Sequence, residues 1–282
     1  MPFEHIAVIG AGTMGHGVAH VAASAGYRVT LYDIDEARVS AGLNKVRANL
    51  DKGVEKGKVS VESRAQTLAQ LGGTTRLGDL ASADLVIEAI PERLALKQSL
   101  FHELEDICAP AAVFATNTSS LSIAKIAAAV ADPSRVIGAH FFNPVHIMTL
   151  LEVVVHEGTR DEVRTELLAF GERIGKECIV VRDVPGFATS RLGVCLGMEA
   201  IRMVEQGVAS AADIDKAMSL GYRHPVGPLR LTDMVGLDVR MAIGEYLARE
   251  LGNAAFEPPA LMRQMVADGK LGQKSGEGFY RW

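Results

Sequence analysis

The sequence predicts an α/β protein in which a doubly wound sheet is followed by an all-helical domain. Short apolar runs typical of buried parallel strands alternate with helical patterns as far as residue 183. After Pro185-Gly186 the apolar residues recur at helical spacing almost throughout. Because 282 residues are enough for two domains of ordinary size, we expect domains over residues 1–184 and 185–282.

A glycine-rich turn follows the first apolar run, Ile6–Ile9, and opens a helix in which every fourth residue is apolar. In its G-x-G-x-x-G spacing, the first glycine allows a tight turn and the second lets the backbone approach a pyrophosphate. The third lets the helix pack closely on the strand. The free N–H groups and positive dipole end of the helix would hold the phosphates. The predicted dinucleotide contacts are Gly10, Ala11, Gly12, Thr13, Met14 and Gly15.

A second strand, Val29–Tyr32, ends on Asp33, 18 residues after the last glycine of the motif. A carboxylate at this place accepts hydrogen bonds from an adenosine ribose. Strand, helix, the Gly26 cap, second strand and acid occur in the order of a Rossmann-type domain, which favours dinucleotide binding over a purely structural βαβ unit. No arginine directly follows Asp33, so the sequence favours NAD over NADP, whose 2′-phosphate a carboxylate would repel.

Composition and charge argue against several other classes of protein. The net charge of −5 and the lack of a long basic run argue against nucleic-acid binding. Three cysteines without a C-x-x-C pair indicate neither a disulfide framework nor a zinc site, and we expect no metal. No apolar run reaches membrane-spanning length, and only four residues precede the first strand. We therefore expect no membrane association, no signal peptide and a cytoplasmic location.

The remaining elements follow from the same patterns. The charged segment from Glu36 to about Gln70 indicates a solvated amphipathic helix pair, although an insertion of this length often reaches over a nucleotide-binding site. Further strands, for seven or eight in all, are expected at Asp84–Ala89, Ala112–Thr116, Val136–His140, Leu150–Val155 and Ile179–Val181. Helices are expected at Leu94–Ile107, Phe187–Gln206, Ala212–Leu220 (with Ser210 as its cap), Asp238–Leu251 and Pro258–Asp268.

Polar residues gather where predicted strands end, which is the edge at which such sheets bind ligands. Glu88, Glu92 and Lys97 surround the turn after one strand, and Asn117–Ser120 forms a polar tip after the next. Helix capping alone could explain Ser120 or its neighbour Ser122. The tip, however, has more hydroxyl groups than a cap needs.

His140 is the candidate general base. Removing hydride from a carbon that bears a hydroxyl requires a base for the hydroxyl proton, and histidine titrates near neutral pH. Among eight histidines, His140 differs in falling at the end of a predicted parallel strand. Glu152, on the next strand, could orient its imidazole as the acid of a hydrolase triad does. Glu152 could equally face solvent on an edge strand.

Taken together, these motifs resemble one known family. The sequence is similar over essentially its whole length to the 3-hydroxyacyl-CoA dehydrogenases, and especially to the bacterial 3-hydroxybutyryl-CoA branch. The segments that match, in the family's order and spacing, are VIGAGTMGHGVA, DLVIEAIPE, TNTSSLSI, GAHFFNPV, LLEVV, PGFATSRL, HPVGPLRLTDMVGLD and KSGEGFY.

The resemblance implies an NAD-dependent, reversible oxidation of (S)-3-hydroxyacyl-CoA to 3-oxoacyl-CoA, with His140 as catalytic base and Glu152 as its partner. It also implies that the helical domain covers the acyl-CoA substrate and forms a homodimer. The residues implied to line the NAD site beside the glycine loop are Asp33, Glu92, Lys97, Ser119, Asn143 and Lys274. Those implied to contact the substrate are Ser119 at the 3-oxygen, Lys56 at the coenzyme A moiety, Asn143 and Ser190.

Ser190 marks one departure from the family pattern. The family commonly has Asn before the Arg-Leu of PGFxxNRL, where its amide contacts the substrate near the reacting oxygen; here Ser190 has a shorter side chain with one proton to donate. Its role is either that contact or a helix cap. Two rival interpretations of the whole chain are a dehydrogenase of this fold that acts on a sugar acid and a non-enzymatic NAD sensor. The His140–Glu152 pair argues against the second.

Overall fold

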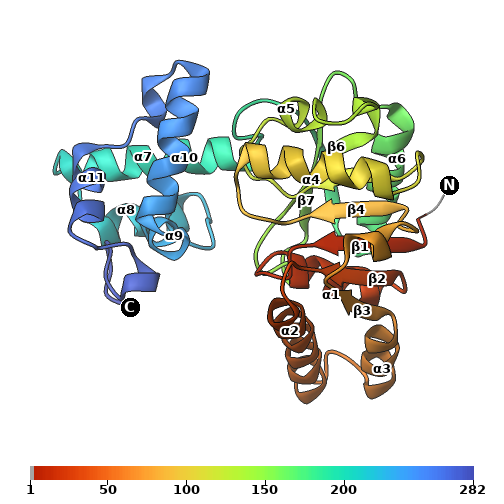
Figure 1. Cartoon of the computed structure of the whole chain (residues 1–282). Coiled ribbons are helices and arrows are strands. Elements are labelled where there is room, and N and C mark those ends of the chain that lie inside the picture. The colour runs from red at the N-terminus through yellow and green to blue at the C-terminus, as the bar shows by residue number, and fades with distance from the viewer. Residues whose placement is uncertain (1–2) are drawn as a thin grey trace. The chain divides into compact units, whose positions relative to one another are not determined.

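Eight strands form one sheet in the computed structural model, which describes residues 3–282 (Figure 1). Their order is β3-β2-β1-β4-β5-β6-β7-β8. Strands β1 to β6 run parallel, β7 is antiparallel to β6, and β8 is parallel to β7. The bounds are β1 His5–Ile9, β2 Arg28–Tyr32, β3 Leu71–Thr74, β4 Leu85–Glu88, β5 Val113–Thr116, β6 Val136–Phe141, β7 Leu150–Val155 and β8 Glu177–Arg182.

The order of the first six strands is that of doubly wound dinucleotide-binding sheets. The chain divides into two compact units, of which the first ends at Val184 and the second begins at Pro185. All the α-helices described after Pro185 belong to the second unit, which contains no strand among its described residues apart from isolated bridges. The predicted fold class, a doubly wound sheet followed by a helical region, is confirmed.

The helices of the first unit include the pair expected after Asp33. Asp35 caps α2 by accepting hydrogen bonds from the N–H groups of Ala37 and Arg38, and only one face of α2 is buried. Figure 1 shows α2 and α3 as a pair next to the β1–β3 end of the sheet. The bounds are α1 Gly15–Ser24, α2 Glu36–Glu55, α3 Val61–Ala69, α4 Leu94–Ile107, α5 Ile123–Ala127 and α6 Asp161–Arg173.

The core of this unit fixes the strand ends that matter for function. Every residue of β1, β4, β5 and β6 is buried. Val18 and Ala22 of α1 pack into the same cluster as Ile6 and Val8 of β1. Burial on both faces is what the continuous apolar runs predict for parallel strands. The carboxyl ends of these four strands are therefore held in place by close packing.

The second unit contains five α-helices around a core of its own. Apolar side chains of α7, such as Met198 and Ile201, pack in one cluster with Leu229, Leu247 and Met262. The Ser210 hydroxyl accepts from the N–H of Asp213, so the predicted cap is confirmed. The bounds are α7 Thr189–Glu205, α8 Ala211–Gly221, α9 Pro228–Val235, α10 Leu237–Leu251 and α11 Ala260–Ala267.

Several elements differ from the sequence-based expectation, and helix α6, Asp161–Arg173, is one that no expected range covers. Strand β3, Leu71–Thr74, was not expected, because Gly72 and Gly73 interrupt any apolar run. Helix α9 was not expected either, since its segment begins among prolines and glycines and is only 8 residues long. Helix α7 starts at Thr189 instead of Phe187, whose φ of +49° is incompatible with an α-helix.

No helix within residues 3–282 is both long and apolar enough to cross a membrane. The cytoplasmic location stays a prediction.

Asp233 anchors the last residues of the chain onto the second unit, and its removal should destabilise that unit. The fully buried carboxylate accepts from the N–H groups of Phe279 and Tyr280 and from Nε1 of Trp282. Asp233→Ala leaves these donors without their acceptor, so we expect a loss of roughly 2–4 kcal/mol in the free energy of unfolding. Urea unfolding followed by the fluorescence of Trp282, the sole tryptophan, measures it.

Asp268→Ala is the matched control, because Asp268 is exposed and accepts one bond, from Gln264 Nε2. Its free energy of unfolding should change by less than about 0.5 kcal/mol. Equal effects of the two substitutions would contradict the anchoring role of Asp233.

Candidate active site

The glycine loop after β1 has the geometry of a phosphate cradle. Gly10 has a φ of +99°, and a Cβ there would lie 2.7 Å from the carbonyl oxygen of Ala89. A Cβ on Gly15 would lie 1.7 Å from the carbonyl oxygen of Gly10, whereas one on Gly12 would meet nothing within 4 Å. Helix α1 begins here with no side-chain cap and no acidic residue in its first turn. Its N-terminal N–H groups are thus suited to an anionic ligand.

Asp33 is held at the edge of an apolar cavity beside this loop. Its Oδ2 accepts from the N–H of Ala11 at 2.8 Å, and its Oδ1 accepts from the N–H of Ile34 at 2.8 Å. The cavity measures 570 Å³, a size that fits an adenosine. Besides Asp33 and the loop residues Gly10, Gly12, Thr13 and Met14, it is lined by Tyr32, Ile34, Arg38, Leu77, Ile90, Pro91, Leu96 and Leu100, among others. These features define a dinucleotide-binding domain.

Lys97 and Glu88 form a fully buried ion pair below the loop that follows β4. Lys97 Nζ lies 2.6 Å from Glu88 Oε1 and also donates to the carbonyl oxygen of Ile90 at 3.3 Å. The other Glu88 oxygen accepts from the Thr116 hydroxyl of β5 at 2.6 Å. Neither charged side chain is exposed, so the structure places Lys97 in the interior. Its NAD contact stays a prediction.

Glu92 accepts hydrogen bonds from the polar tip that follows β5, residues Asn117–Ser120. Its Oε1 accepts from the hydroxyls of Thr118 and Ser120 and from the N–H of Ser119 at 3.0 Å. Glu92 Oε2 lies 3.4 Å from Lys97 Nζ. The Asn117 side chain accepts from the N–H of Phe141 at 2.9 Å, which ties the tip to the end of β6. Ser119, half-buried, therefore lies on a tip bonded both to the β4 loop and to β6.

His140 and Glu152 lie directly opposite each other across the antiparallel pair β6–β7. His140 Nδ1 is 2.6 Å from Glu152 Oε2. Glu152 is completely buried and His140 is 7% exposed. The imidazole also contacts the Phe142 ring, with centroids 4.5 Å apart. A carboxylate this close to one ring nitrogen fixes the tautomer of the neutral ring by accepting a hydrogen bond from Nδ1–H.

The other predicted site residues lie elsewhere on the two units. Asn143 is exposed in the turn after β6, and Lys56 follows α2. Ser190 is in the first turn of α7, and Lys274 pairs with Asp238, both within the helical unit. The roles of these residues stay predictions.

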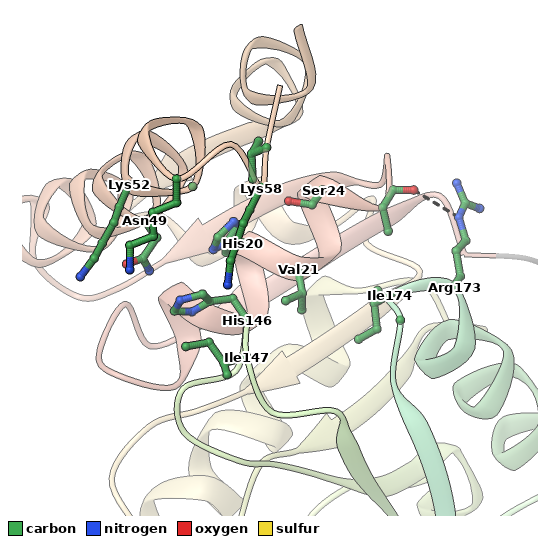
Figure 2. A pocket seen from close by; sticks show the side chains of 15 residues that line it. His20, Val21, Ser24, Asn49, Lys52, Lys58, His146, Ile147, Arg173 and Ile174 are labelled. Carbon is green, nitrogen blue, oxygen red and sulfur yellow. Dashed lines mark hydrogen bonds between the residues drawn. The ribbon is translucent and has the colours of Figure 1, made fainter. Parts of the chain in front are cut away.

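A second cleft, of 830 Å³, is formed by α1, α2, the turn after β6 and the end of α6 (Figure 2). Lys52, Lys56, Lys58 and Arg173 line it, and no carboxylate is among its described lining residues. The sequence singled out Lys56, and Lys52 and Lys58 are its close neighbours in the same charged segment. Arg173 comes from α6, far along the chain, so no local signal points to it.

Comparison with known proteins assigns the family. Residues 5–184 match the family model for the NAD binding domain of 3-hydroxyacyl-CoA dehydrogenase, and residues 186–282 match its C-terminal domain. A probable 3-hydroxybutyryl-CoA dehydrogenase of Bacillus subtilis is 42% identical over 280 residues, covering 99% of this chain and 98% of that protein. The crystal structure of (S)-3-hydroxybutyryl-CoA dehydrogenase from Ralstonia eutropha matches with a TM-score of 0.97 and 39% identity over 99% of both chains.

A 3-hydroxybutyryl-CoA dehydrogenase of Mycobacterium tuberculosis is likewise 42% identical, over 281 residues and with 99% and 98% of the two chains covered. The chain therefore belongs to the 3-hydroxyacyl-CoA dehydrogenase family of NAD-dependent oxidoreductases. The family and the cofactor NAD predicted from the sequence are confirmed.

The buried position of Lys97 generates a test that separates a structural role from cofactor contact. Lys97→Met leaves the Glu88 carboxylate buried without its counter-charge, which costs about 3–5 kcal/mol of folding stability. The Lys97→Met/Glu88→Gln double variant removes both charges, so it should recover much of that loss. Urea unfolding measures both variants. Unchanged unfolding of Lys97→Met with weaker NAD binding would contradict the structural role.

Proposed function

We propose that this dehydrogenase oxidises short-chain (S)-3-hydroxyacyl-CoA, such as (S)-3-hydroxybutyryl-CoA, reversibly to 3-oxoacyl-CoA with His140 as general base. The observation that carries the proposal is the 2.6 Å contact between His140 Nδ1 and Glu152 Oε2 at the end of β6. The names of the full-length relatives, 3-hydroxybutyryl-CoA dehydrogenases, support a short acyl chain.

In this mechanism Glu152 accepts a hydrogen bond from the protonated Nδ1 of His140, which leaves the unprotonated Nε2 as the base. Nε2 takes the proton of the 3-hydroxyl group, and the Glu152 carboxylate stabilises the imidazolium that forms. Bound NAD supplies the acceptor for the hydride that leaves the same carbon. In the reverse direction protonated His140 donates to the 3-oxo oxygen. Ser119 hydrogen-bonds this oxygen and, with His140, stabilises its developing charge.

The NAD site in this proposal is built on the glycine loop and Asp33. The loop and the start of α1 hold the diphosphate, and the Asp33 carboxylate accepts from the adenosine ribose hydroxyls. A 2′-phosphate would meet this carboxylate, so NAD is used rather than NADP. Glu92, Ser119, Asn143 and Lys274 complete the site, and the buried Lys97 supports it through its ion pairs with Glu88 and Glu92.

Coenzyme A is assigned to the second cleft through Lys56. Phosphate groups favour a cleft whose charged lining residues are all cationic. Asn143 and Ser190 contact the acyl portion of the substrate. The helical unit covers the substrate and forms a homodimer, and exposed apolar residues such as Met234, Val235 and Leu192 favour such an interface.

Substitution of the pair tests the mechanism directly. His140→Ala should lower kcat by about 10²–10⁴-fold, the usual scale for a general base, while NADH still binds because the glycine loop is intact. Glu152→Gln should also lower kcat, since the amide keeps a bond to Nδ1 but supplies no counter-charge. Steady-state kinetics and NADH fluorescence titration measure these effects. Near-normal turnover of His140→Ala would point to another base, with His146 the next candidate.

Lys56→Ala tests the assignment of coenzyme A. The KM for acetoacetyl-CoA should rise roughly 2- to 10-fold, as expected for one exposed charge-assisted contact. The KM for acetoacetyl-pantetheine, which has no phosphate, should stay unchanged. Lys45→Ala is the matched control, because Lys45 is an exposed lysine of α2, the helix that Lys56 follows, and does not line the cleft. A KM that rises equally for both thioesters would refute the phosphate contact.

A further inference from the structure

Two histidines form part of the wall of the second cleft. His20 of α1 and His146 of the turn after β6 stack with ring centroids 5.4 Å apart and an interplanar angle of 30°. Figure 2 shows them side by side, with Asn49 and Lys52 on one side and Ile174 and Arg173 on the other. The cleft thus has a cationic end on α2 and a middle section of imidazole and aliphatic groups.

The cation on the far side has other partners within the protein. The Arg173 guanidinium lies 4.2 Å from the centre of the Tyr27 ring and donates to the carbonyl oxygen of Ala25. Apolar side chains, among them Val21 and Ile147, also line the cleft. An uncharged part of a ligand therefore fits this section, whereas phosphates fit the lysine end.

His20 has hydrogen-bonding capacity that the protein does not use. Its Nδ1 is buried and has no hydrogen-bond partner among the described residues, and the side chain is 8% exposed on the cleft. A buried polar atom left without a partner is unfavourable. Because Nδ1 is covered, a ligand in the cleft meets the edge of the ring that does not carry this nitrogen.

The imidazole of His20 is neutral at physiological pH. Burial, together with the smaller effect of the positive charges of His146, His16 and Lys176, lowers its pKa to about 4. A neutral ring has one N–H donor and one acceptor nitrogen. This pairing complements an amide, which also has one donor and one acceptor, better than it complements a phosphate, which needs a cation or donors only.

The turn that bears His146 is held firmly. Buried Lys176 donates to the carbonyl oxygens of Val145 and Met148 at 2.5 and 2.6 Å, on either side of His146. The same turn begins directly after β6, the strand of His140. His146 therefore lies on the turn that joins the end of β6, the strand of His140, to β7.

We propose that His20 and His146 form the contact surface for the pantetheine arm of acyl-CoA, and that the imidazole of His20 hydrogen-bonds an amide group of that arm. The inference rests on the proposed function and adds a substrate-binding residue to it. The lysines then bind the phosphates, and His20 binds the neutral linker between the phosphates and the thioester.

The test compares three thioesters that differ in how much of coenzyme A they contain: acetoacetyl-CoA, acetoacetyl-pantetheine and S-ethyl acetothioacetate, which lacks both phosphates and amides. His20→Leu should raise KM about 2- to 10-fold, the range for one neutral hydrogen bond, for the first two thioesters. The substitution should leave kcat unchanged, because the contact stabilises the ground state and the transition state equally. It should also leave the KM for the third thioester unchanged, because that thioester has no amide to bond.

His20→Gln, which restores a donor and an acceptor, should recover most of the affinity and keeps the test decisive if His20→Leu folds poorly. His102→Leu, an exposed histidine on α4, is the control and should change nothing. A KM that rises only for acetoacetyl-CoA would show a phosphate contact and overturn the inference. An equal rise for all three thioesters, or no rise, would overturn it as well.

Failure of the wider proposal looks different. If His20 is wrongly assigned, the unmodified enzyme still reduces acetoacetyl-CoA with NADH. The Lys56→Ala substitution then still raises the KM for acetoacetyl-CoA and for neither of the other thioesters. If the proposed function is wrong, the unmodified enzyme reduces none of the three thioesters.

Discussion

The antiparallel pairing of β6 with β7 is the constraint on which the proposed chemistry depends. Residues directly opposite in such a pair bring their side chains together on one face of the sheet. The register sets Glu152 against His140, and the neighbouring pairs Ala139–Val153 and Phe141–Leu151 are buried. The distance between base and carboxylate is therefore set by two packed strands, which hold functional groups more rigidly than loops do.

The loops around this pair depend on a second set of buried charges. Glu88 and Lys97 join β4 to α4, and Thr116 extends the network to β5. Glu92 then collects the hydroxyl groups of the next tip, and Asn117 connects that tip to the N–H of Phe141. The ends of β4, β5 and β6 are thus linked by polar contacts. A site assembled from three strand ends needs such links, because each loop alone is mobile.

Much of this arrangement is predictable from local sequence. Each of three patterns reflects a structural requirement within one short segment of the chain: the glycine spacing, the acid after the second strand and the apolar runs. Gly15 is a clear case, since no Cβ fits between α1 and the carbonyl oxygen of Gly10. The position of His140 at a strand end follows in the same way from the run Val136–His140.

The rest depends on contacts between distant segments. A lysine in a charged helix is expected to be exposed, so the burial of Lys97 cannot be foreseen without knowing that Glu88 lies beneath it. His20 looks like an ordinary helical residue until the turn after β6 brings His146 onto it. Strand β3 has no apolar run of its own, and it exists because β2 offers an edge with which to pair.

The most direct test of the central claim is the tautomer of His140, measured by long-range ¹H–¹⁵N NMR of the histidine-labelled enzyme at a pH where the ring is neutral. The His140→Ala spectrum assigns the signals. If Glu152 orients the base, the proton resides on Nδ1 and Nε2 is unprotonated, ready to accept the substrate's proton. A neutral ring protonated on Nε2 would contradict the account, because the nitrogen assigned to the substrate would then have no lone pair to offer.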